Sequence, residues 1–194
     1  MSTVPIFADE SWRLPSRGRA GMLSLIVGES AIFTIFVVAY IYYIGRSTYG
    51  PTPKILEVPI FNSICLLSSS ATIILAEHAI AHGLMRRFAA WWALTMLLGM
   101  EFLAGTAIEW RKLIFEDHLT IRSNLFGTTY YSLVGLHATH VVVGLIGLSL
   151  VMLFTLAGRV QQKHAERIQV LALYWHFVDA VWVVVFTVVY IVGR

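Results

Sequence analysis

The chain has 194 residues, of which 58% are hydrophobic and 13% are charged, and its mean hydropathy is +0.75. A soluble domain, in which about half of the residues are apolar and a quarter charged, could not bury so much apolar surface, so lipid must solvate part of this chain. The formal charge of +3 is small, and the Lys and Arg residues lie between apolar segments, which argues against a nucleic-acid partner.

Residues 1–21 are predicted to form a polar, cytoplasmic N-terminal tail. This stretch carries Arg13, Arg17 and Arg19, and the apolar segment that follows is too long for the hydrophobic region of a signal peptide. We therefore expect no cleaved leader, and a transmembrane domain that covers residues 22–194.

Five apolar segments long enough to cross about 30 Å of hydrocarbon follow one another along the chain. Backbone N–H and C=O groups cannot pair with water in hydrocarbon, so each segment must be helical. Six aromatic residues near segment ends are typical of membrane interfaces: Trp91, Trp92, Trp110, Tyr174, Trp175 and Tyr190. The predicted fold is an all-α membrane protein with five transmembrane helices at about 22–44, 59–80, 88–108, 128–156 and 170–192.

The distribution of Lys and Arg predicts the orientation of these helices. The tail and the second and fourth loops hold 3, 2 and 3 such residues, whereas the first and third loops and the C-terminus hold 2, 3 and 1. Because cytoplasmic loops carry more Lys and Arg, the N-terminus is expected in the cytoplasm and the C-terminus in the periplasm.

Ionisable side chains inside the apolar segments indicate where function should be sought, because each is costly at membrane depth unless protein or trapped water surrounds it. Glu29 has no basic partner in its own segment, so it is expected either to be protonated or to reach a partner across an interface. The candidate residues are Glu29, Glu77, His78, Glu101, Glu109, His137, His140, His176 and Asp179.

Two pairs of these residues are three positions apart and share a helix face: His137 with His140, and His176 with Asp179. For each pair, a satisfied interior polar contact and a proton or metal role are both open. Small residues at Ser68–Ala71, Gly135, Gly144 and Gly147 indicate close helix packing. We expect no metal in this chain, since Cys65 is the single cysteine, expected buried and inert, and the histidines do not obviously supply two facing pairs.

Several motifs resemble those of subunit III of haem-copper terminal oxidases, in its short five-helix form. Tyr174-Trp175-His176-Phe177-Val178-Asp179 is similar to the last helix of that family, and Gly135-Leu136-His137-Ala138-Thr139-His140-Val141 to the helix before it. The resemblance continues in Pro59-Ile60-Phe61-Asn62, in Leu67-Ser68-Ser69, in Glu109-Trp110 and in Gly28-Glu29-Ser30.

The resemblance implies a subunit of the oxidoreductase complex that has no catalytic centre of its own. Haem and copper would belong to the partner subunits I and II, phospholipid would be bound, and the chain would lie in the bacterial inner membrane. Glu29 would lie toward the catalytic subunit and support proton uptake or oxygen access. His78, Glu109, His137, His140, His176 and Asp179 become candidates for buried polar contacts or for lipid contacts.

The chain has no counterparts of the first two helices of longer family members. The sequence therefore does not decide whether a lipid cleft between two helix groups is present. A cytochrome c oxidase is the first interpretation. A quinol oxidase or a nitric oxide reductase partner is the alternative. Interpretations from other classes are a small proton-coupled carrier and a di-haem cytochrome; five helices without a repeat argue against the carrier.

Overall fold

The computed structural model describes residues 16–44, 46 and 50–193, and within them the regular secondary structure is helical. The helices are α1 (Arg17–Tyr43), α2 (Ile60–Ala81), α3 (Met85–Phe115), α4 (Leu125–Leu156) and α5 (Ala165–Phe186). A π-helical turn, Thr187–Val192, continues α5, and short 3-10 turns lie at Pro53–Ile55 and Gln162–His164. All five long helices are apolar enough to cross a membrane, so the prediction of a helical, multi-pass membrane protein is confirmed.

The helices extend beyond the apolar segments predicted from the sequence. α3 begins at Met85 and ends at Phe115, whereas hydropathy placed it at 88–108. Helical hydrogen bonding continues through charged residues such as Arg111, because these long side chains can extend toward water while the backbone stays helical. Likewise α1 begins at Arg17, inside the predicted tail, whose residues 1–15 lie outside the described part of the chain.

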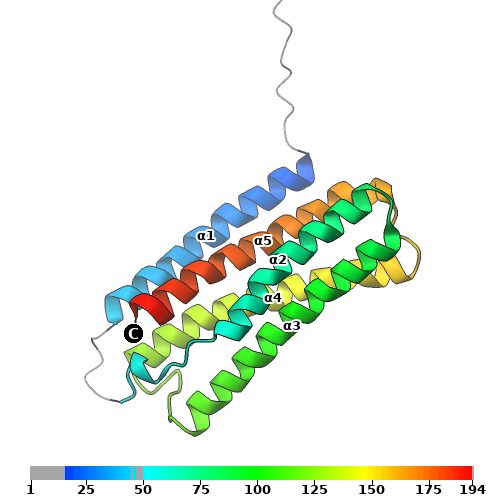
Figure 1. The fold of residues 1–194 in the computed structure, drawn as a ribbon. Coiled ribbons are helices and arrows are strands. Elements are labelled where there is room, and N and C mark those ends of the chain that lie inside the picture. The colour runs from blue at the N-terminus through cyan, green and yellow to red at the C-terminus, as the bar shows by residue number, and fades with distance from the viewer. Residues whose placement is uncertain (1–15, 45, 47–49, 194) are drawn as a thin grey trace, which may run out of the picture.

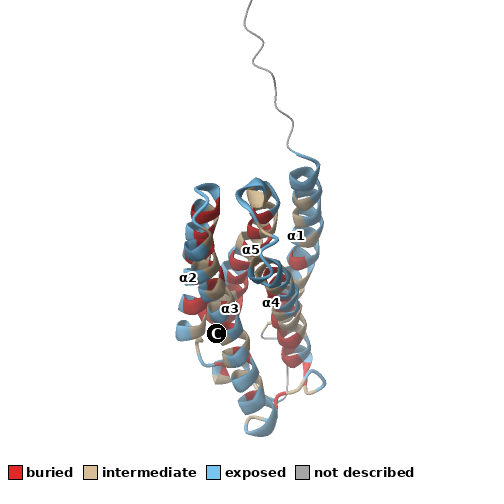
Figure 2. Cartoon of the chain, turned by 90° about the vertical axis from the view of Figure 1, so that its right-hand side faces the viewer, coloured by how far each residue is buried: buried red, intermediate tan, exposed pale blue. Residues whose placement is uncertain are grey.

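α5 occupies the middle of the bundle. It packs against α1, α2 and α4, while α3 packs against α2 and α4 on the far side (Figure 1). Among the long helices, α1 packs substantially against α4 and α5 alone. Of its residues, only Phe33 and Tyr40 are buried. Figure 2 shows α1 mostly in the colour of exposed residues. α1 is therefore the outermost helix.

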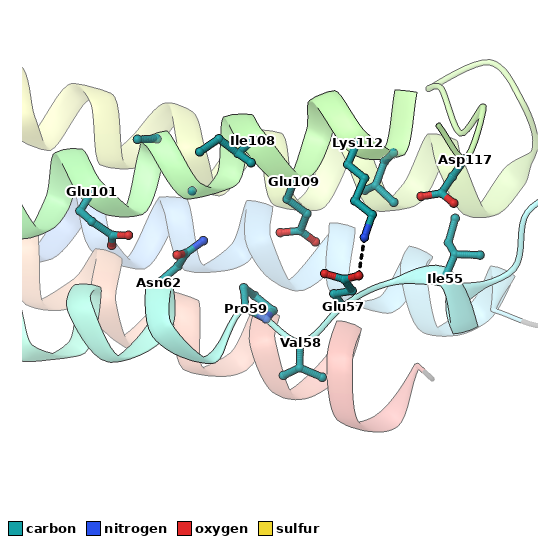
Figure 3. A pocket seen from close by; sticks show the side chains of 13 residues that line it. Ile55, Glu57, Val58, Pro59, Asn62, Glu101, Ile108, Glu109, Lys112 and Asp117 are labelled. Atoms are coloured by element: carbon teal, nitrogen blue, oxygen red, sulfur yellow. Dashed lines mark hydrogen bonds and ion pairs between the residues drawn. The ribbon is translucent and has the colours of Figure 1, made fainter. Parts of the chain in front are cut away.

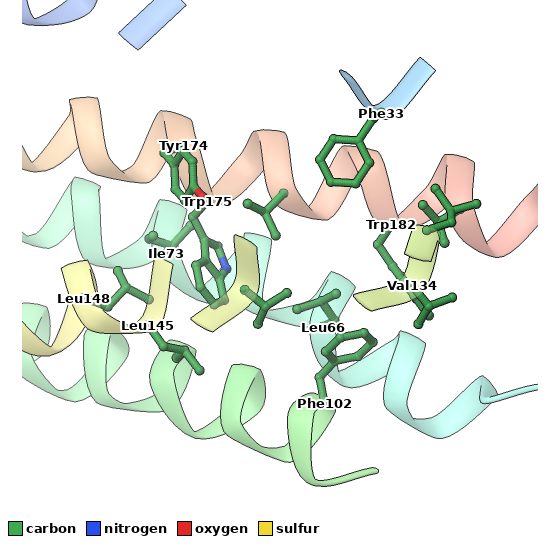
Figure 4. Close-up of a cluster of buried hydrophobic side chains, with 14 of the residues drawn as sticks. Phe33, Leu66, Ile73, Phe102, Val134, Leu145, Leu148, Tyr174, Trp175 and Trp182 are labelled. Atoms are coloured by element: carbon green, nitrogen blue, oxygen red, sulfur yellow. The ribbon is translucent and has the colours of Figure 1, made fainter. Parts of the chain in front are cut away.

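The Trp175 side chain joins α5 to three other helices at the centre of the core (Figure 4). Its Nε1 donates a hydrogen bond to Ser69 Oγ on α2 at 2.8 Å. Its ring fills the space left by two glycines, because a Cβ on Gly99 of α3 or on Gly144 of α4 would lie 2.8 Å from a ring carbon. The small residues therefore do provide close packing, but here they accept an aromatic ring and not another backbone.

Four of the six aromatic residues near the segment ends are buried within the bundle. Trp92 and Trp175 are 0% exposed, Tyr190 is 3% exposed and Tyr174 is 6% exposed. Each finds an internal acceptor for its polar hydrogen: Trp92 Nε1 donates to the Leu148 carbonyl at 2.9 Å, and Tyr190 donates to Glu109. Internal partners explain the burial, since an aromatic N–H or O–H must be satisfied when it leaves water.

Two glycines end α2 and α4 in the same way. Gly83 has φ +71° and Gly158 has φ +69°, and the backbone N–H of the residue after each bonds a carbonyl five positions earlier. This is the Schellman termination, which favours glycine at the left-handed position. Gln162 Nε2 also donates to the Ala81 carbonyl at 2.6 Å, so the loop after α4 covers the end of α2.

Candidate functional site

Glu29 on α1 and His140 on α4 form a pair across the helix interface. Glu29 Oε2 lies 3.1 Å from His140 Nε2, and the two side chains are 24% and 13% exposed. Because α1 spans Arg17–Tyr43, Glu29 lies near the middle of the helix. Of the two predictions for Glu29, a partner across an interface is the one observed.

The geometry of His140 fixes where a proton must lie in this pair. His140 Nδ1 is 2.8 Å from the Leu136 carbonyl oxygen, which can only accept, so Nδ1 carries a hydrogen. A hydrogen bond between Nε2 and Glu29 Oε2 then needs one further hydrogen, on either of these two atoms.

His137 does not take part in this pair, although it lies three residues from His140. It is 0% exposed, stacks on Trp182 at 4.9 Å between ring centroids, and meets the Phe102 ring edge to face. Among the described residues, neither ring nitrogen has a hydrogen-bond partner. His137 and His140 therefore do not bond each other, because the two side chains project toward different neighbours.

Asp179 and His176 are brought together by a third residue, Ser70 of α2. Ser70 Oγ hydrogen-bonds Asp179 Oδ2 and lies 3.1 Å from His176 Nδ1, so the hydroxyl bridges the two groups. Asp179 is buried, whereas His176 is only half-buried. Asp179 Oδ1 is buried without a hydrogen-bond partner among the described residues. A polar contact between His176 and Asp179 therefore exists, but it runs through Ser70 and involves only one of the two carboxylate oxygens.

Glu109 of α3 is held by two tyrosines. Its Oε1 accepts hydrogen bonds from Tyr190 at 2.9 Å and from Tyr130 at 3.2 Å, so α3, α4 and the turn after α5 meet at one carboxylate. Two phenol donors on one oxygen stabilise an ionised carboxylate in a partly buried place. This arrangement fits the buried polar contact predicted for Glu109.

Glu109 also lines a cavity of about 360 Å³ between the start of α2 and the end of α3 (Figure 3). On α3, Glu101, Gly105 and Glu109 follow one another at four-residue intervals, so they share the face that lines it. Gly105 leaves room for Asn62 of α2, since a Cβ there would lie 2.1 Å from the Asn62 amide nitrogen. The opening carries the ion pair between Lys112 and Glu57.

A second cavity, of about 310 Å³, lies between α1 and α5 and is almost wholly apolar. Phe33 and Phe177 line it, and the Phe33 ring also lies 5.0 Å from the His140 ring. Ser30, the residue after Glu29, belongs to the same lining. Glu29 and His140 are not part of this lining, but Ser30 and Phe33, which are, lie next to the pair.

His78 lies apart from these groups. It is exposed near the end of α2, with its ring centroid 4.2 Å from that of His82, so it is not a buried polar contact within the described chain. Among the described residues, no group of three or more His, Cys, Asp and Glu side chains is placed to hold a metal ion. Cys65 is buried as expected.

Sequence reasoning missed three participants in these contacts: Ser70, Tyr130 and Tyr190. Ser70 was interpreted as a small packing residue and Tyr190 as an interfacial aromatic, because both interpretations follow from composition alone. Their actual role depends on which helices are neighbours. A signal was nevertheless present, because an unpaired carboxylate in an apolar helix requires donors from elsewhere in the bundle.

The described helices and their interior polar pairs define a multi-pass helical membrane protein. A family model for cytochrome c oxidase subunit III matches residues 16–194. The chain is 32% identical over 177 residues to cytochrome c oxidase subunit 3 of Bacillus subtilis, covering 89% of this chain and 85% of the relative. It is 35% identical over 180 residues to the Synechocystis protein of that name, covering 88% and 74%.

A fish protein of the same name, from Cyprinus carpio, is 31% identical over 186 residues, which cover 89% of this chain and 68% of the relative. The chain therefore belongs to the cytochrome c oxidase subunit III family, and it is a subunit III of a haem-copper oxidase that associates with other oxidase subunits. The resemblance inferred from the motifs is confirmed.

Proposed function

We propose that this chain is a non-redox accessory subunit of a proton-pumping cytochrome c oxidase in a bacterial inner membrane. It packs beside subunits I and II, which hold the haem and copper, with its N-terminus in the cytoplasm and phospholipid on its remaining surface. Its function is to stabilise the catalytic subunit and to support proton uptake or oxygen access. Relatives that are named cytochrome c oxidase subunit 3 support cytochrome c, and not quinol, as the donor.

The observation that carries this proposal is the position of Glu29. The residue lies on the outermost helix, is 24% exposed, and bonds inward to His140. An acid that is only partly covered at mid-helix is costly in lipid, so a neighbouring protein is expected to cover it. The exposed face of α1 is apolar, with Val27 and Ile35 at 71% and 67% exposure, and is suited to packing against another membrane helix.

The cavity beside Glu29 supports oxygen access in particular. Its lining is apolar except for Ser30 and Thr34, and apolar cavities stay dry and take up apolar guests. Dioxygen is such a guest. Neither Glu29 nor His140 lines the cavity, and the described residues that form its wall include no ionisable side chain.

The test is the turnover of the purified oxidase that carries Glu29→Ala, compared with Glu116→Ala as a control at an exposed carboxylate outside both cavities. We expect Glu29→Ala to assemble with the haem-bearing subunits and to lose activity faster during sustained turnover than the control. Failure of Glu29→Ala to assemble would assign the residue a structural role instead.

The rival from another class, a proton-coupled carrier, predicts that liposomes which contain only this chain take up protons. We expect no uptake above that of empty liposomes. We also expect the chain to copurify with a haem-containing large subunit and to lack a Soret band of its own. Proton uptake by the isolated chain would overturn the accessory role. A haem spectrum of the isolated chain would instead support the interpretation as a di-haem cytochrome.

A further inference from the structure

We propose that Ser70 relays a proton between His176, at the partly exposed edge of α5, and Asp179, in the buried core. Three side chains from two helices form one hydrogen-bonded chain in the order His176 Nδ1, Ser70 Oγ and Asp179 Oδ2. The inference concerns a proton-binding site that is separate from the Glu29–His140 pair, and it does not depend on which electron donor the oxidase uses.

A hydroxyl suits the bridging position because it donates one hydrogen bond and accepts others at the same time. In the first arrangement His176 Nδ1–H donates to Ser70, and Ser70 donates to an Asp179 carboxylate. In the second arrangement protonated Asp179 donates to Ser70, and Ser70 donates to an unprotonated Nδ1. The chain therefore permits both directions of donation without any change in position of the three oxygen and nitrogen atoms.

Uptake of one proton converts the first arrangement into the second. A proton binds His176 Nε2 and forms the imidazolium. The Nδ1 hydrogen then passes to Ser70 while the hydroxyl hydrogen of Ser70 passes to Asp179 Oδ2. One proton has been gained, the carboxylate has become a carboxylic acid, and the neutral imidazole has changed tautomer from Nδ1–H to Nε2–H. No hydrogen is lost, and the charge of the unit rises from −1 to 0.

Burial favours the end state of this transfer. Asp179 is 3% exposed, so a neutral acid is cheaper there than a carboxylate. Asp179 Oδ1 has no partner among the described residues, and Ser69 Oγ lies 3.5 Å from Oδ2 while it hydrogen-bonds the Leu66 carbonyl at 2.6 Å. The carboxylate is thus held by one strong donor, Ser70, which is a poor substitute for hydration.

The ionisable groups on the neighbouring helices do not compete for this proton. From α1 and α4, Glu29 and His140 bond each other, and His137 stacks on Trp182. On α2, Cys65 contacts Glu101 of α3, and Glu77 lies seven residues beyond Ser70, about 10 Å along the helix and on the same face. Glu77 is half-buried and is the group from which a proton could approach His176.

The experiment uses the intact oxidase with Ser70→Ala, and Ser68→Ala as the matched control at an exposed serine of α2. Infrared spectroscopy follows the carbonyl stretch of protonated Asp179, assigned by its loss in Asp179→Asn. Nitrogen-15 magnetic resonance follows the tautomer of His176. In the wild type and in Ser68→Ala we expect proton uptake to change both signals together: the carbonyl band of protonated Asp179 appears as the tautomer of His176 changes.

In Ser70→Ala we expect the two changes to separate, and deuterium exchange of the Asp179 acid to slow by about tenfold or more. Ser70→Thr, which restores a hydroxyl, should restore coupling. If Ser70→Ala does not assemble, the coupling between Asp179 protonation and the His176 tautomer is still measured in the wild type and in Ser70→Thr. Independent protonation of His176 and Asp179 in the wild type, or equal exchange rates in Ser70→Ala and Ser68→Ala, would overturn the proposal.

Discussion

Gly144 on α4 faces the Trp175 ring on α5 so closely that a Cβ on the glycine would lie 2.8 Å from two ring carbons. Neither partner can yield easily, because Trp175 is fully buried and its Nε1 is held by Ser69. Helix association inside a membrane depends on such close packing, since apolar surface gains nothing by leaving lipid.

Gly144→Ala should therefore destabilise the bundle by about 1–3 kcal/mol through overpacking. The measurement is unfolding of the purified subunit in mixed micelles, followed by circular dichroism. Gly21→Ala on α1 is the control, because its new Cβ meets nothing within 4 Å and alanine is the better helix former. Equal stability of the two variants would mean that Trp175 moves aside without cost.

Replacement of His137 by phenylalanine should not lower the stability of the protein, whereas replacement of His140 should lower it. His137→Phe keeps the stack on Trp182 and removes two buried nitrogens without partners, so stability should be unchanged or rise by about 1 kcal/mol. His140→Phe leaves Glu29 without its partner and should cost about 1–3 kcal/mol. The same unfolding assay compares them. His137→Leu checks for overpacking, and a large loss in both His137 variants would indicate a bound water.

The start of α4 should depend on the Asn124 side chain. Its Oδ1 accepts from the Gly127 N–H at 2.8 Å, and its Nδ2 donates to the Pro51 carbonyl at 2.9 Å, so it caps the helix and holds the first loop. Asn124→Ala should cost about 0.5–2 kcal/mol. Ser16→Ala, at an N-terminal position without a side-chain capping bond, should change stability by less than about 0.5 kcal/mol. Proteolysis of the first loop offers a second measurement.

The two tyrosines at Glu109 should be energetically coupled. Tyr130→Phe or Tyr190→Phe alone leaves one donor on Glu109 Oε1, whereas the double variant leaves neither of these two donors. We expect each single change to lower the free energy of unfolding by about 1 kcal/mol. The double variant should lose more than the sum of the two single losses, by at least about 0.5 kcal/mol. Tyr174→Phe combined with Tyr190→Phe should be additive, since Tyr174 bonds the His140 carbonyl instead. Additivity in both combinations would show that Glu109 is satisfied in some other way.

The sequence by itself determined the membrane class, the five helices and the family. Hydropathy establishes the membrane class and the helices, because hydrocarbon permits only a backbone that bonds within its own helix. The family followed from the resemblance of the motifs in the last two helices. Glu29 and Asp179 were also identifiable from the sequence, since an acid in an apolar segment is conspicuous at any depth.

The partners of those acids were decided only by the tertiary structure. His140 lies 111 positions from Glu29, and Ser70 lies 109 positions from Asp179, so no spacing rule within one helix could join them. The burial of Trp175 and Tyr190 was likewise decided by the tertiary structure, because the hydrogen-bond acceptor of each side chain lies on another helix. Helix periodicity says which residues share a face, but the choice of the facing helix depends on how all five pack together.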